Sequence, residues 1–309
     1  MPDIVIAFFI LGFVAGYLKS DLQVPKSIYE TLSLLLMLVL GLKGGLALHG
    51  QALTPMLPSI GLVITAGFII PLLLYPLLRH IVRLCNDDAA AVAACYGSVS
   101  AGTFAVVLAA VDAAGLPLAP QTTLFLVLLE LPAIVIMLMV HRHYSGSGKL
   151  GHILQEALTS RGVLLLGGGV LIGALYGPDG LAPLSGALFG GFKTMLALFL
   201  LEMGLCTAKV CHPMPWHAWR LFVFALTIPL ALSWVGIGMG LWLGMPEGTV
   251  WVLATLMASG SYIAAPAAIR AAIPDANLGL TMLASLGLTF PFNVLIGIPL
   301  YKYWTGLFF

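Results

Sequence analysis

The chain has 309 residues, of which 61% are hydrophobic and only 8% are charged, and its formal net charge is +1. About a quarter of the residues of a water-soluble domain are charged, so a mean hydropathy of +1.08 excludes the soluble classes of protein. The apolar residues come in stretches of about 20, the length at which a helix crosses roughly 30 Å of hydrocarbon. Because barrel strands alternate apolar and polar residues, these stretches indicate an all-α polytopic membrane protein.

Ten apolar spans, separated by charged or Pro/Gly-rich breaks, are predicted along the chain. No basic leader region precedes the first of them, so we interpret it as a membrane span and not as a cleaved signal. The predicted spans are 3–19, 27–47, 57–79, 89–115, 122–140, 160–177, 186–208, 218–244, 248–273 and 278–303.

The charges orient these spans. Ten of the 13 Lys and Arg residues lie in the first, third, fifth, seventh and ninth loops. By the positive-inside rule these loops face the cytoplasm, so both termini are expected on the periplasmic side of a bacterial inner (plasma) membrane.

Two halves of the chain share landmarks in the same order. We predict a first five-helix repeat over residues 1–141, a cytoplasmic connecting loop over 142–159 and a second repeat over 160–309. Since each half has an odd number of spans, the second half enters the membrane from the opposite side, which makes an inverted repeat. The matched landmarks are Gly12-x-x-x-Gly16 with Gly169-x-x-x-Gly173, Gly41-Leu42 with Gly204-Leu205, Ser98-Val99-Ser100 with Ser259-Gly260-Ser261, and Leu131-Pro132 with Phe290-Pro291. For the Gly-x-x-x-Gly pairs themselves, tight helix packing is the simpler interpretation.

The fourth and ninth spans are predicted to be broken at mid-membrane. Each carries small and hydroxyl-bearing residues at its centre, and Pro266 removes a backbone donor from the ninth. The freed amides at the start of each second half-helix carry partial positive charge, so two such ends facing one another form an anion site. The candidate anion-site residues are Ser98, Ser100, Gly102, Thr103, Ser259, Gly260, Ser261 and Tyr262.

The chemistry of these breaks limits the anion. Neither contains Lys or Arg, and phosphate or a dicarboxylate usually recruits Arg. A small, singly charged oxyanion is therefore favoured. The alternative is that the hydroxyls bond back to their own helix carbonyls and only ease packing.

Two carboxylates lie inside apolar spans, where an ionised group is costly unless it is paired or functional. Glu130 precedes Pro132 in the fifth span, so it could hold a cation or take up a proton. Asn293, after Pro291 in the tenth span, could contribute a carbonyl oxygen to that cation site or satisfy freed backbone. Glu202 in the seventh span could instead be a packing residue. No metal site or cofactor is expected, because the four cysteines form no C-x-x-C pair.

Several runs resemble the sodium-dependent bicarbonate transporter family over nearly the whole chain. The most specific are the Ser-rich fourth span and the Ile-Pro-x-Ala-Asn run after the ninth. The runs are Val24-Pro25-Lys26-Ser27-Ile28-Tyr29, Gly41-Leu42-Lys43-Gly44-Gly45, Tyr96-Gly97-Ser98-Val99-Ser100-Ala101-Gly102-Thr103, Glu130-Leu131-Pro132-Ala133, Ile269-Arg270-Ala271-Ala272-Ile273-Pro274-Asp275-Ala276-Asn277 and Gly297-Ile298-Pro299-Leu300-Tyr301.

The resemblance implies a homotrimeric symporter with ten helices per protomer, bicarbonate between the two breaks and sodium beside it. The chain departs from the family pattern in three places. Tyr262 stands where the family has an extended serine run followed by Asp, Glu130 replaces an Asp, and the central loop is short. The first two changes touch the cation ligands, and the third argues against a nucleotide-sensing, PII-like regulatory partner.

The sequence thus predicts a secondary active transporter that imports bicarbonate by alternating access. The third to fifth and eighth to tenth spans would shift against a scaffold of the first, second, sixth and seventh. Coupling would be to sodium or, through Glu130, to protons. A transporter of another small anion or a monocarboxylate, and a non-transporting membrane sensor or scaffold, remain alternatives. An intramembrane enzyme is not expected, because no His-Glu-x-x-His or paired-Asp motif occurs.

Overall fold

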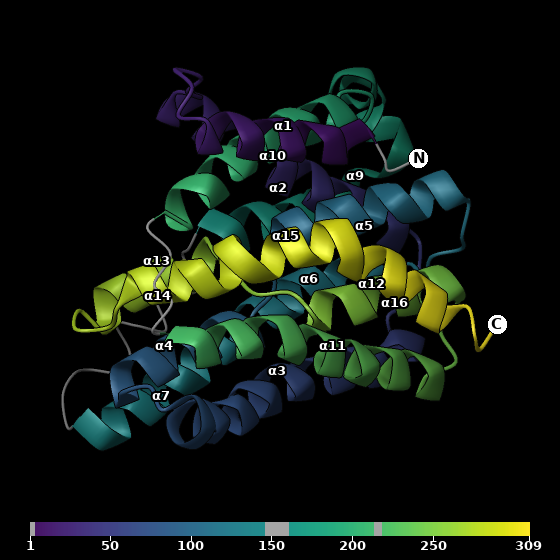
Figure 1. The fold of residues 1–309 in the computed structure, drawn as a ribbon. Coiled ribbons are helices and arrows are strands. Elements are labelled where there is room, and N and C mark those ends of the chain that lie inside the picture. Colours follow the sequence, from purple (N-terminus) through teal and green to yellow (C-terminus); the bar gives the residue numbers. More distant parts are fainter. Residues whose placement is uncertain (1–3, 146–160, 213–217) are drawn as a thin grey trace.

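The structure is a computed structural model that describes residues 4–145, 161–212 and 218–309. Within these ranges every regular element is helical and no strand occurs, which confirms the predicted all-α class. Figure 1 shows the helices stacked in layers that run across the view.

Four helices form one group, at the top of Figure 1, and glycines bring their backbones together. A Cβ atom on Gly12 would lie 2.0 Å from the Leu201 carbonyl oxygen, and one on Gly45 would lie 2.2 Å from the Val170 carbonyl oxygen. The simple interpretation of the Gly-x-x-x-Gly pairs as close-packing sites is therefore confirmed. The four helices are α1 (Ile4–Tyr17), which lies against α10 (Phe192–Val210), and α2 (Lys26–Leu48), which lies against α9 (Arg161–Leu188).

The α9 helix is longer than the predicted sixth span. Gly177 has a non-helical conformation (φ 62°, ψ −169°) at the predicted end, but the helix restarts there and continues to Leu188. The restart follows from Pro178, whose fixed φ suits the first turn of a helix. As a result the seventh span begins at Phe192 and not at residue 186.

The remaining helices of the first half cover the third, fourth and fifth predicted spans. The last of them passes the predicted start of the connecting loop at Arg142, and the loop from residue 146 onward lies outside the described residues. These elements are η1 (Thr54–Met56), α3 (Leu57–Leu77), the π-helical turn η2 (Leu78–Val82), α4 (Asn86–Gly97), α5 (Ala101–Ala114), α6 (Thr122–Glu130) and α7 (Pro132–Ser145).

The second half contains the eighth, ninth and tenth predicted spans. Pro291 and Pro299 lack an amide donor, and the tenth span alternates α-helical and π-helical turns around them. The elements are α11 (Trp219–Trp242), α12 (Glu247–Met257), α13 (Ala264–Ala272), α14 (Leu278–Met282), η4 (Leu283–Thr289), α15 (Phe290–Phe292), η5 (Asn293–Gly297) and α16 (Ile298–Thr305).

The fourth span lies at the centre of the molecule. In an 18-residue stretch within residues 86–114, 94% of the residues are buried, a larger share than in any other candidate span. Figure 1 shows α5, α12 and α15 between the group of four helices and an outer layer that includes α3, α7 and α11. The mid-span breaks are thus placed where water and lipid are excluded by helices on both sides.

Seven helical segments within the described residues are long and apolar enough to cross a membrane, judged by length and composition alone. Three predicted spans are not among these seven, because their helices are too short or carry too many charged residues. The first is described over only 14 residues, α10 carries Lys193, Glu202 and Lys209, and the ninth is divided into helices of 11 and 9 residues. A multi-pass membrane protein is supported, and the count of ten stays a prediction.

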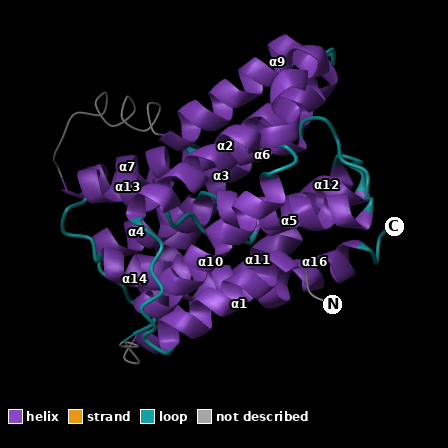
Figure 2. Ribbon diagram, turned by 90° about the horizontal axis from the view of Figure 1, so that it is seen from above, coloured by secondary structure: helices purple, strands orange, loops and turns teal. Residues whose placement is uncertain are grey.

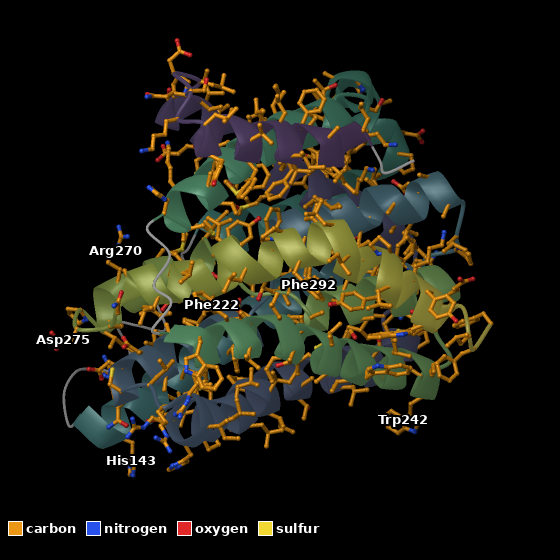
Figure 3. The ribbon with its side chains drawn as sticks, viewed as in Figure 1. His143, Phe222, Trp242, Arg270, Asp275 and Phe292 are labelled. Atoms are coloured by element: carbon orange, nitrogen blue, oxygen red, sulfur yellow. The ribbon has the colours of Figure 1, made fainter. Side chains whose placement is uncertain are left out.

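The loops gather at the two ends of the helices, and the N- and C-terminal ends of the drawn chain share one of them (Figure 2). Figure 3 shows His143, Arg270 and Asp275 at the opposite end from Trp242. The charged ends of α7 and α13 therefore lie away from both termini.

Candidate transport site

Both predicted mid-span breaks are present. The first separates α4 from α5 at residues 98–100, where Ser98 (ψ 176°) and Ser100 (ψ 116°) have extended backbones. The second separates α12 from α13 at residues 258–263, and Pro266 follows in the first turn of α13. Short hydroxyl side chains favour this outcome because they bond to nearby backbone groups and so compete with a continuous helix.

The two breaks cross and are joined by hydrogen bonds. The Ser261 amide donates to the Cys95 carbonyl oxygen at 2.8 Å, and the Ser100 amide donates to Ser259 Oγ at 3.0 Å. Ser100, Ser259 and Ser261 are each at most 3% exposed. Segments about 160 residues apart in the sequence therefore meet at one buried point.

The first turn of α5 has unused backbone donors. The first four amides of an α-helix have no partner inside the helix, and here they belong to residues 100–103. Ser259 Oγ accepts from the Ser100 amide and Ser100 Oγ accepts from the Thr103 amide at 3.0 Å. The amides of Ala101 and Gly102 have no hydrogen-bond partner among the described residues.

The first turn of α13 repeats this arrangement. Ser261 Oγ accepts from the Ala265 amide at 3.1 Å, and Pro266 has no amide to satisfy. This leaves the amides of Ile263 and Ala264. Each break thus presents two donors at the positive end of a helix.

The candidate hydroxyls differ in whether their protons are used. Ser98 donates to the Glu130 carbonyl at 3.0 Å, Ser259 to the Leu256 carbonyl at 2.7 Å, and Thr103 to Ser100 Oγ at 3.0 Å. Ser100 and Ser261 donate to no backbone carbonyl within the described part of the chain, and the Ser100 hydroxyl lies beside the Tyr262 hydroxyl. The Tyr262 hydroxyl is buried there without a partner. Of the three donating hydroxyls, that of Ser259 bonds back to its own helix, as the alternative interpretation expects, whereas that of Ser98 bonds to the end of α6.

Residues of both breaks border a small, mainly apolar cavity under the group of four helices. Its volume is about 10 Å³, at the lower limit for a single water molecule. Ala101, Gly102 and Ile263 line it from the two breaks. The opposite wall comes from α2 and α10, and consists of Ser33, Leu36, Met37, Leu40 and Phe199. Sequence reasoning missed this wall, and its one polar signal was Ser33, a single hydroxyl inside an apolar run.

Gly102 and Tyr262 are placed together across the two breaks. A Cβ atom on Gly102 would lie 2.1 Å from the Tyr262 hydroxyl oxygen, so glycine is required for the present position of that ring. The ring also makes an edge contact with Phe290 at 5.2 Å between centroids. Gly260 is less constrained, because the nearest atom to its Cβ would be 3.4 Å away.

Glu130 lies beside the first break. It ends α6 immediately before the Leu131-Pro132 interruption, is 5% exposed, and receives the Ser98 hydroxyl at its backbone carbonyl. Its carboxylate oxygen Oε2 is buried and has no hydrogen-bond partner in the described ranges. A buried carboxylate of this kind is suited to holding a cation or a proton.

Asn293 forms a hydrogen bond at the second break. Its Nδ2 donates to the Ala258 carbonyl at 2.8 Å, just past the end of α12, and its Oδ1 accepts from the Tyr301 hydroxyl at 2.8 Å. The amide thus satisfies backbone freed by the interruption, which was one of its two expected roles.

Glu202 lies on α10, outside the crossing. Its Oε1 accepts from the Cys206 thiol at 3.3 Å, while Oε2 is buried without a partner among the described side chains. No group of three or more His, Cys, Asp and Glu residues that could hold a metal ion occurs in the described residues. Oxygen ligands for sodium would come instead from Glu130 and from carbonyls freed at the breaks.

A family model matches this chain, although none of the curated proteins compared with it does. The model of the Na+-dependent bicarbonate transporter superfamily matches residues 4–306, which include both breaks, Glu130 and Asn293. With a match over nearly its whole length, added to apolar helices and two crossing half-helices, the chain belongs to the Na+-dependent bicarbonate transporter superfamily.

Proposed function

We propose that the chain is a secondary active transporter that imports bicarbonate by alternating access, coupled to sodium. One observation carries the proposal: the starts of α5 and α13 border the same small cavity, and Ser100 and Ser261 cap the first turns of these two helices. The family to which the chain belongs supplies the substrate and the co-transported ion.

The donor set favours a small, singly charged anion. No Lys or Arg lines the cavity, so charge must be neutralised by helix ends and hydroxyls. A helix end contributes at best about 2 kcal/mol and a charge-assisted hydrogen bond roughly 1.5–3, while micromolar affinity needs about 8. Both helix ends and several donors must therefore act together, and a bound cation would help.

Glu130 is proposed to hold the coupling ion. It is next to the first break, and its carboxylate has an unsatisfied oxygen in a place where charge is costly. A sodium ion held there would offset the charge of the nearby anion. Asn293 is proposed to support the second break from the opposite side.

An inverted repeat of two five-span halves is supported by the packing of α1, α2, α9 and α10. Gly204 of α10 approaches Phe9 of α1, and Gly41 of α2 approaches Gly169 of α9. Exchanging the halves converts the first contact into the second, because Gly41 matches Gly204 and the first span matches the sixth. The same exchange converts the first break into the second.

We further propose a homotrimer in the bacterial inner membrane with both termini on the periplasmic side. The start of α1 and the end of α16 lie at the same end of the helices (Figure 2), as an even number of crossings requires. The group α1, α2, α9 and α10 is proposed as the scaffold, against which the other helices shift to expose the cavity on alternate sides.

Reconstituted vesicles test this function. Counterflow of labelled bicarbonate, with and without sodium, should be present in the parent chain and reduced roughly tenfold or more in Ser100→Ala and Ser261→Ala, since each loses a charge-assisted hydrogen bond. Ser285→Ala is the matched control, because the Ser285 proton is already donated to the Thr281 carbonyl at 3.0 Å. Counterflow of a monocarboxylate but not of bicarbonate would identify a different substrate, and no counterflow of any small anion would favour a sensor or scaffold.

A further inference from the structure

A large cavity lies away from the crossing, in a groove between η2 at the end of α3 and the beginning of α11. Its volume is about 480 Å³, within the range of small-molecule sites. The lining residues are Leu77, His80, Ile81, Val82, Arg83, Trp219, Arg220, Val223, Phe224, Thr227 and Ile228. A second cavity, of about 240 Å³, shares Val82, Trp219 and Arg220 with it. Nothing in the transport site explains this groove.

One end of the groove is basic. Arg83 and Arg220 both line it, and neither forms an ion pair with a carboxylate of the described residues. The Arg220 guanidinium lies 5.5 Å from the centroid of the Trp219 ring. By contrast, nearby Arg79 donates to the Leu84 carbonyl oxygen and so helps to close the end of η2. Two guanidinium groups are thus available to an outside anion.

The rest of the groove is apolar, and much of it is uncovered. Ile81 is 67% exposed and Val223 is 52% exposed. Both lie toward the inside of candidate membrane spans, which cover Thr54–Val82 and Trp219–Trp242. Arg83 directly follows the span Thr54–Val82, and Arg220 lies at the start of the span Trp219–Trp242. The cations therefore sit at span ends, where lipid headgroups lie, and the apolar lining extends into the hydrocarbon layer.

We propose that this groove is a binding site for one anionic phospholipid, with its phosphate at Arg83 and Arg220 and an acyl chain along the apolar lining. Guanidinium groups bind phosphate oxygens in bidentate fashion. Basic pockets between spans bind acidic lipid headgroups on the cytoplasmic side, which is the side assigned to these two loops by their charge. The site is independent of the transported ion and of the coupling mechanism.

Lipid titration of the purified full chain tests the site. Native mass spectrometry or thermal unfolding should show tighter binding of phosphatidylglycerol than of phosphatidylcholine to the parent chain. The preference should weaken roughly tenfold or more in the double variant Arg83→Asn/Arg220→Gln. Loss of each cation near the headgroups should weaken the binding of an acidic lipid by about tenfold or somewhat less. Asparagine is chosen because Arg83 has a left-handed φ of 66°, which that residue tolerates.

Two matched controls keep the result interpretable. Lys209→Gln/Arg270→Gln removes two exposed cations from the same end of the molecule, with Arg270 pointing outward in Figure 3, and should retain the preference. Val223→Trp fills the groove without changing charge and should also abolish the preference, whereas Val235→Trp, on the exposed side of the same helix, should not. If the double arginine variant folds poorly, Val223→Trp and Val235→Trp still test whether the lipid binds in the groove.

Three outcomes would overturn the proposal. They are equal binding of the two lipids by the parent chain, equal losses in the arginine and control variants, and displacement of the lipid by inorganic phosphate at similar concentration. The last would show a site for a small phosphate anion and not for a lipid. None of these readouts measures transport, so they stand apart from the function proposed above.

Discussion

Glycines have different structural roles between α1 and α10 and at the crossing of the two breaks. Between α1 and α10, a Cβ on Gly12 would meet the Leu201 backbone carbonyl at 2.0 Å, so rigid backbone excludes any side chain. At the crossing, a Cβ on Gly102 would meet the Tyr262 hydroxyl at 2.1 Å, the end of a side chain from the other break. The first glycine allows helices to pack, and the second allows a hydroxyl and an amide to share one small space.

Polar groups follow the same division. The buried faces between α1 and α10 and between α2 and α9 are lined mainly by glycine and apolar residues, whereas the crossing concentrates six buried hydroxyl-bearing candidates. Backbone that is helical needs no outside partner, but interrupted backbone does. We infer that the first region fixes the shape of the protein and the second carries its chemistry, and variants can separate the two.

The largest effect is expected at Gly102. Gly102→Ala should lower bicarbonate uptake about a hundredfold, because a displaced Tyr262 and a blocked Gly102 amide together remove two charge-assisted hydrogen bonds. Uptake into vesicles and thermal unfolding should be measured on the same preparations. Gly61→Ala is the control, since nothing lies within 4 Å of the added Cβ there.

A double variant sharpens this test. Adding Tyr262→Phe to Gly102→Ala removes the clashing oxygen, so thermal stability should return while uptake stays low. If uptake also returned to the parent level, the Tyr262 hydroxyl would have no part in anion binding.

Glu130→Gln should abolish the dependence of uptake on sodium, with a loss of roughly tenfold or more at saturating sodium. Glutamine keeps the shape of the side chain but cannot hold the charge that a bound cation needs. Initial uptake rates across a sodium series measure the effect. Glu202→Gln is the matched control, because Glu202 is as deeply buried but lies on α10. Sodium dependence unchanged in Glu130→Gln and lost in Glu202→Gln would move the coupling site to the scaffold.

A smaller effect, on stability alone, is expected in the packed region. Gly12→Ala should destabilise the protein by about 1–3 kcal/mol through overpacking, and lower the unfolding temperature by several degrees. Gly168→Ala in α9 has open space around the added Cβ and should be neutral or slightly stabilising. Equal unfolding temperatures for the two variants would show that the close approach of α1 to α10 does not limit stability.

Much of the architecture could be predicted because lipid imposes simple rules. Apolar stretches marked the helices, and Pro and Gly marked where they break, as at residues 98–100 and 258–263. Boundaries were less predictable where a helix continues through a residue that usually ends one. The Gly177 kink inside α9 and the extension of α7 to Ser145 are two such cases.

The meeting of the two breaks was predictable, but the hydrogen bonds made there were not. Clustered hydroxyls in two matched spans pointed to the crossing, yet nothing in the sequence distinguishes Ser98, whose proton is donated to the Glu130 carbonyl, from Ser100, which donates to no backbone carbonyl of the described residues. That difference depends on which carbonyl lies nearby in space. The wall of α2 and α10 residues over the cavity was missed for the same reason, since Leu36 and Phe199 are unremarkable in apolar spans.

The smallest effect is expected where the two regions touch. Lys43 of α2 pairs with Asp112 near the end of α5 at 3.6 Å, and its ammonium lies 4.7 Å from the centroid of the Phe192 ring. If α5 shifts against the scaffold during transport, this pair must break in each cycle. Half-exposed pairs contribute about 0.2–1 kcal/mol, so Lys43→Gln and Asp112→Asn should each change the uptake rate by no more than about fivefold. The double variant should match either single one, because the second change removes a bond already lost. Fully additive effects would show that the two residues act independently, so that breaking this pair is not a step of the transport cycle.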